Sequence, residues 1–196
     1  MKESNFVGPQ LVKNEFFNSL PQELQAELEQ VNGFVVYSGG FHLRGICSEP
    51  IWHSLEEVVS GESALFEYFE EVNNGDIPFA QDCMGDQFIL RADKVIRLYA
   101  EAGELEPLNM GLVEFMNKIR NDHEDLLDLE VLEVVADSEE GALEPGEVLI
   151  ADPPFAMEES EQGVKLAAIP AMEALQYYAE LAQQIQSVAR AEEVDD

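Results

Sequence analysis

The chain has 196 residues, of which 46% are hydrophobic, and its 41 acidic and 10 basic residues give a net charge of −31. This length fits one domain, or one domain with an elaborated end, and it is enough to fold without a disulfide or a metal. So negative a charge excludes binding to nucleic acid phosphates or anionic lipid and favours cationic protein partners, although it also serves solubility alone.

The charge is unevenly distributed. Residues 1–120 hold 20 acidic and 8 basic residues, a net −12, whereas residues 121–196 hold 21 and 2, a net −19. No stretch approaches the roughly 20 apolar residues of a membrane span, and the first residues lack the apolar segment of a signal peptide. We therefore expect a soluble, cytoplasmic protein.

The first third of the chain alternates helical and strand patterns. Residues 1–18 are expected to form an arm, loose or as a short helix. Ser19 and Gln22 have the spacing of a capping box, and the helix they predict ends at Asn32-Gly33. We then expect strands at 34–37 and 41–46, a short helical element from Trp52, and another helix at 65–72.

Residues 77–90 have the local chemistry of a β-hairpin. Phe79, Phe88 and Leu90 supply strand-forming bulk, and Gly85 is flexible enough for a tight turn. We interpret the motif residues as structural, with Pro78 setting the strand entry and the aspartates capping the turn. These motif residues are Pro78, Phe79, Asp82, Gly85 and Asp86.

The remaining elements repeat the alternation. In chain order we expect a strand at 95–99, a loop at 103–107, a helix at 108–127, a strand or helix end at 131–136, an acidic connection at 137–147, strands at 148–150 and 164–169, and a helix after Pro170. Tight turns join most of the strands, which favours antiparallel pairing. The predicted fold class is α+β, a mostly antiparallel sheet flanked by helices.

The histidines and cysteines do not form a recognisable catalytic or metal-binding pattern. His42, His53 and His123 have no partner at metal-ligand spacing, and Cys47 and Cys83 are too far apart for a redox or zinc motif. We interpret His42 as half-buried and hydrogen-bonded, His123 as a surface group among carboxylates, and both cysteines as buried thiols.

Other catalytic patterns are missing from the sequence as well. Asp82, Asp86 and Asp93 lack the spacing of a calcium loop, and turn capping is the stronger interpretation. No nucleophile elbow and no phosphate-binding loop is present. We therefore expect no enzymatic activity, no catalytic residue, no metal and no cofactor.

Several separated features resemble the SUKH superfamily in the same order. They are Leu20-Pro21 at a helix start, Asn32-Gly33 before a strand, the Gly39-Gly40 loop, Trp52, and the segment Ile77-Pro78-Phe79-Ala80 followed by Asp82, Gly85-Asp86 and the Phe88/Leu90 strand. This resemblance covers about residues 19–122. It implies an N-terminal arm at 1–18 and one domain at 19–196, in which 131–196 is either a closing hairpin and helix or an elaboration.

The resemblance implies a protein-binding role. Many bacterial members are thought to be immunity proteins that neutralise toxins, often nucleases, and the family has no shared catalytic residues. A cationic toxin domain would suit the acidity of this chain, because electrostatic steering raises association rates. The candidate contact residues are Asp122, Glu124, Asp125, Asp128, Asp137, Glu139 and Glu140.

Two other functional classes remain open. A housekeeping scaffold or regulator of the same fold would bind a neutral or acidic partner with little salt dependence. A small-molecule-binding or enzymatic protein would have an apolar pocket with convergent polar groups on the concave side of the sheet.

Overall fold

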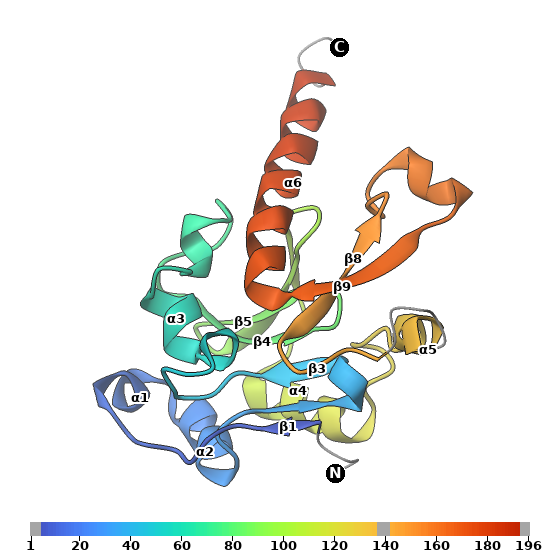
Figure 1. The fold of residues 1–196 in the computed structure, drawn as a ribbon. Helices are drawn as coiled ribbons and strands as arrows, with labels where there is room; N and C mark the ends of the chain where they lie inside the picture. The colour runs from blue at the N-terminus through green and yellow to red at the C-terminus, as the bar shows by residue number, and fades with distance from the viewer. Residues whose placement is uncertain (1–4, 137–141, 193–196) are drawn as a thin grey trace.

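The computed structural model describes residues 5–136 and 142–192, and of residues 188–192 it describes the backbone only. A seven-stranded antiparallel sheet, a separate two-stranded hairpin and six α-helices confirm the α+β class (Figure 1). The strands are β1 (Phe6–Val7), β2 (Phe34–Val36), β3 (Phe41–Leu43), β4 (Ile77–Asp82), β5 (Gln87–Arg91), β6 (Lys94–Tyr99), β7 (Glu104–Pro107), β8 (Glu147–Asp152) and β9 (Lys165–Pro170). The α-helices are α1 (Glu15–Ser19), α2 (Gln22–Gln30), α3 (Leu55–Ser60), α4 (Leu112–Asn121), α5 (Glu130–Ala136) and α6 (Ala171–Glu192).

The main sheet is a meander in which every strand pairs with its neighbour in sequence, in the order β1 to β7. The predicted hairpin is confirmed: β4 and β5 pair from Ile77 opposite Leu90 to Gln81 opposite Gln87, with a bulge between Pro78 and Ala80. The outer strands are short, since β1 has two residues and β7 has four. The last residue of β7 is Pro107, which lies opposite Ile96.

Two apolar cores lie on opposite sides of the sheet, as the alternation of side chains along a strand requires. The first packs α1, α2 and α4 against Phe41, Phe79 and Phe88. The second packs α6 and the 65–72 segment against Ile89 and Leu98. In Figure 1, α6 rises from the sheet with the β8–β9 hairpin beside it.

Several local predictions are wrong. Ser19 caps no helix; it ends α1, its hydroxyl donates to the carbonyl of Phe16, and α2 begins after Pro21. The predicted loop at 103–107 contains β7, because β6 offers it a partner. The helix predicted at 65–72 is a 3₁₀ segment, Leu65–Glu67, followed by turns.

The segment left open at 131–136 is the helix α5, and the helix predicted at 108–127 is confined to α4. Among residues 5–136 and 142–192, no helix is both long enough and apolar enough to cross a membrane.

Candidate functional site: an acidic cleft

The carboxylate of Asp82 is hydrogen-bonded to the backbone of the β4–β5 turn. Asp82 Oδ1 accepts the backbone N–H groups of Met84 at 2.9 Å and Asp86 at 3.1 Å, while the N–H of Gly85 donates to the carbonyl of Asp82. Asp82 therefore caps the turn, as its position in the sequence predicts. Asp86 does not cap this turn: its Oδ1 accepts the N–H of Ala100, beyond β6.

Arg97 on β6 joins both aspartates. Its Nη2 lies 2.7 Å from Asp82 Oδ2 and 2.7 Å from Asp86 Oδ2, and its Nε donates to the same Asp86 oxygen. The guanidinium also lies over the Tyr99 ring, 4.8 Å from its centroid. Burial raises the pKa of both carboxyls, although Arg97 opposes that shift. One half-buried cation is thus already shared between two carboxylates.

Arg97 is at the junction of two adjoining hollows with volumes of about 500 and 450 Å³, which share Arg97 and Asp128. We call this pair of hollows the acidic cleft. Its carboxylates come from the β4–β5 turn, the β6–β7 turn, β7, the α4–α5 connection and α5: Asp86, Glu101, Glu104, Glu124, Asp125, Asp128, Glu130 and Glu133. Seven carboxylates besides Asp86 therefore line the cleft, whereas its arginine is already paired with Asp82 and Asp86.

The second hollow has apolar walls as well. Tyr99 and Phe155 are 37% and 50% exposed, and Met84, Val131 and Tyr178 line it too. The loop that carries Phe155 is held by Glu101, whose carboxylate accepts the N–H groups of Phe155 and Ala156. The cleft can thus take a positive group whose stem is apolar.

The structure brings together three of the seven predicted contact residues. Glu124, Asp125 and Asp128 line the acidic cleft. Asp122 lines a different hollow, beside Lys94 and Lys118. Asp137, Glu139 and Glu140 lie outside the described residues. Pro78 and Phe79 are buried, and the Pro78 carbonyl accepts a hydrogen bond from Arg44.

Sequence reasoning missed Arg97, Glu101 and Glu104 as members of the cleft. The available signal was the spacing along β6, where Arg97 and Tyr99 are two residues apart and therefore point to the same side of the sheet. Asp86 was assigned to the turn, and nothing in its neighbourhood indicated a partner eleven residues later.

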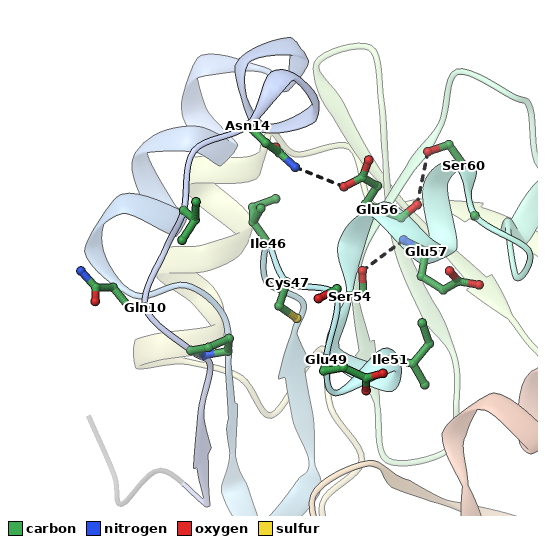
Figure 2. A pocket seen from close by; sticks show the side chains of 14 residues that line it. Gln10, Asn14, Ile46, Cys47, Glu49, Ile51, Ser54, Glu56, Glu57 and Ser60 are labelled. Atoms are coloured by element: carbon green, nitrogen blue, oxygen red, sulfur yellow. Dashed lines mark hydrogen bonds between the residues drawn. The ribbon is translucent and has the colours of Figure 1, made fainter.

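A separate hollow of about 660 Å³, outside the acidic cleft, lies between the N-terminal segment and α3 (Figure 2). Two of its three carboxylates are engaged: Glu56 accepts from the Asn14 amide and Glu57 from the N–H of Ser63. Burial and nearby Glu49 raise the pKa of the Cys47 thiol, which is only half-buried, contrary to the prediction. A thiol so protonated, with no histidine in the lining, is a poor nucleophile.

A buried polar row that the sequence did not indicate lies on the α6 side of the sheet. His42 Nε2 lies 2.8 Å from His53 Nδ1, and His53 Nε2 lies 3.0 Å from the carbonyl of Asn32. Arg44 contacts Gln81 and Gln87 nearby. His42 is hydrogen-bonded, as predicted, but it is fully buried rather than half-buried, and its partner His53 is eleven residues away.

The remaining groups do not add a reactive centre. Cys83 is buried, its thiol lies 3.7 Å from the Asp128 carbonyl, and burial raises its pKa. His123 stacks on Tyr37, with ring centroids 4.2 Å apart. Within the described part of the chain, no three histidine, cysteine or carboxylate side chains are placed to share a metal ion.

Comparison with known proteins identifies the fold but no family. No family model matches the chain, and no curated protein matches it. The fold is similar to the crystal structure of Atu4351 from Agrobacterium tumefaciens, with a TM-score of 0.57 over 88% of this chain and 83% of that chain. The two chains are 12% identical, so the similarity concerns the fold alone, and membership of the SUKH superfamily stays a prediction.

Proposed function

We propose that this chain is a non-enzymatic, cytoplasmic protein-binding module of the immunity type, which binds and neutralises a cationic toxin domain through the acidic cleft. The observation that carries this proposal is the imbalance of charge there: seven carboxylates line the cleft in addition to Asp86, and Asp82 and Asp86 already pair with Arg97. Lysine or arginine side chains of a partner would supply the missing positive charge.

The lining of the cleft supports a protein ligand of this kind. Exposed Tyr99 and Phe155 offer apolar surface to the methylene stems of basic side chains, and carboxylates at the rim steer a positive partner from a distance. A nuclease that holds phosphates with basic residues has such a surface, and a cover over that surface would compete with nucleic acid.

Affinity capture from the native host, washed at low and at high salt and followed by mass spectrometry, tests the identity of the partner. We expect a basic toxin domain that is retained at low salt and released at high salt, since screening weakens such contacts. Capture of cell-division or envelope factors, insensitive to salt, would contradict the immunity role and favour a housekeeping scaffold.

Charge-matched variants test the cleft itself, with fluorescent octalysine as the probe. The triple variant Glu124→Lys, Asp125→Lys, Asp128→Lys should bind octalysine at least about 10-fold more weakly than the wild type. This estimate assumes that each lost carboxylate–ammonium pair at the surface contributes under ~1 kcal/mol to binding. The control Glu23→Lys, Glu62→Lys, Glu67→Lys changes the net charge equally at exposed positions outside the cleft. Equal losses in both variants would show that only net charge matters.

A second candidate function is favoured by one feature. The hollow of about 450 Å³ combines Met84, Tyr99, Val131 and Phe155 with polar groups that converge on it, as a small-molecule site would. A cationic amphiphile such as a polyamine would suit it. Isothermal titration with spermidine distinguishes this candidate: saturable one-to-one binding that survives Glu124→Lys together with Asp125→Lys, neither of which lines this hollow, would support it.

A further inference from the structure

Besides Arg97, a second arginine, Arg44, is enclosed by the fold, on the α6 side of the sheet. Arg44 directly follows β3 and is 4% exposed. Its Nη1 donates to the Pro78 carbonyl at 2.8 Å, and its Nη2 donates to the side-chain oxygens of Gln81 and Gln87 at 2.6 and 2.8 Å. All three acceptors are neutral, so hydrogen bonding is provided without a counter-charge.

The buried guanidinium is therefore incompletely satisfied. No carboxylate of residues 5–136 or 142–192 forms an ion pair with Arg44, and its Nε has no acceptor among them. Burial lowers the pKa of Arg44 to about 9, which leaves the group charged at neutral pH. A buried cation without an anion is strongly disfavoured in a protein interior.

Arg44 lines a small, mostly enclosed cavity of about 10 Å³ between the sheet and α6. Gln81 and Gln87 border it on the sheet side. The helix contributes residues of its first turns: Ala171, Met172, Ala174, Leu175 and Tyr178. This volume is at the lower limit for one water-sized particle, so sulfate, phosphate and carboxylates do not fit.

The helix end at this cavity is positive. The N–H of Ala171 donates to the Gly146 carbonyl, but the next N–H groups of the first turn have no partner within the helix itself. Pro170, the residue before the helix, has no side chain that can cap them. Since α6 has 22 residues, its full macrodipole adds positive potential at this point.

We propose that the cavity between Arg44 and the first turn of α6 binds a single halide ion, which is chloride under physiological conditions. Size restricts the guest to a single atom or a water molecule. The buried Arg44 guanidinium, whose Nε has no partner, and the first turn of α6 line the same cavity, and their positive potential favours an anion over neutral water. Met172 is half-buried and unbranched, so its side chain can yield to an ion slightly larger than water. The ion supplies the counter-charge that Arg44 lacks, and its site is separate from the acidic cleft.

Anomalous diffraction from crystals of the full chain soaked in sodium bromide tests this site directly. Bromide replaces chloride and scatters anomalously near its absorption edge. We expect one anomalous peak within hydrogen-bond distance of Arg44 Nε and the α6 N–H groups. Density without an anomalous signal would identify a water molecule and overturn the proposal.

Thermal unfolding in matched salts is the solution measurement. At equal ionic strength, the melting temperature should be about 3 °C higher in chloride than in gluconate. Arg44→Met should abolish this difference, and Arg91→Met, which removes a half-exposed arginine elsewhere, should keep it. If Arg44→Met does not fold, the wild-type comparison still decides, because coincident chloride and gluconate curves would contradict the site.

Discussion

At the scale of single residues, the His42–His53 contact fixes where two protons are. A carbonyl oxygen can only accept, so His53 Nε2 must carry the hydrogen that it donates to Asn32. The bare Nδ1 of His53 then accepts from His42 Nε2. A further proton on His53 Nδ1 would break the hydrogen bond with His42. A further proton on His42 Nδ1 would instead place a positive charge in a buried site near Arg44, and burial together with Arg44 lowers the pKa of His42.

This pair predicts loss of stability in mild acid. Burial lowers the pKa of His53 to about 4 and that of His42 well below its usual range, while in the unfolded chain both are near 6.5. The unfolded state therefore binds more protons between these values. The free energy of unfolding should fall as pH falls from about 6.5 toward 4, by up to ~1.4 kcal/mol per pH unit for each histidine.

Urea denaturation between pH 7 and pH 5 measures this slope. His42→Gln places an amide N–H where the imidazole Nε2–H stood and removes one titrating group, so its slope should be smaller. His123→Gln is the matched control, because His123 lies outside the pair. Parallel curves for the wild type and His42→Gln would contradict the assigned protons.

At the scale of elements, the β4–β5 hairpin shows what local sequence can predict. Its strands and turn follow from aromatic residues around a glycine, and both were predicted correctly. The turn also packs against Tyr178 of α6. Gly85 has φ +80°, and a Cβ atom there would lie 2.8 Å from the Tyr178 ring, whose hydroxyl donates to the Leu149 carbonyl.

Gly85→Ala should therefore lower the free energy of unfolding by about 2–3 kcal/mol, of which ~1–2 comes from the left-handed backbone and the rest from displacing Tyr178. Chemical denaturation measures the loss. Gly75→Ala is the control, because no atom lies within 4 Å of its Cβ position. A Gly85→Ala protein as stable as Gly75→Ala would show that the turn and α6 adjust freely.

Elements whose formation depends on distant partners were predicted poorly. The residues of β7 have the composition of a loop and become a strand because β6 pairs with them. The Ser19–Gln22 spacing fits a capping box, yet Pro21 separates two short helices there. In both cases a tertiary contact or a neighbouring helix outweighs the local signal.

At the scale of the whole molecule, the acidic cleft depends on the tertiary fold. Its lining comes from the β4–β5 turn, β6, β7, the α4–α5 region and the loop after β8. The sequence predicted the acidity and pointed to three residues that line the cleft, because composition and charge runs are local properties. It did not predict Arg97 between Asp82 and Asp86, because that contact exists only after the strands pair.

A net charge of −31 also predicts that repulsion within the chain opposes folding. Raising sodium gluconate from about 10 to about 200 mM shortens the screening length and should raise the melting temperature by several degrees. Circular dichroism at a fixed protein concentration measures the shift. A melting temperature that does not change with gluconate would mean that the carboxylates are too dispersed to repel one another appreciably.

The proline that ends β7 has a consequence for how copies of this molecule meet. A strand at the margin of a sheet invites another backbone to join it, but Pro107 has no N–H to offer and the acidic side chains beside it repel an identical neighbour. At that margin the backbone is therefore a poor template for a second copy, and growth of fibres by strand addition is disfavoured there.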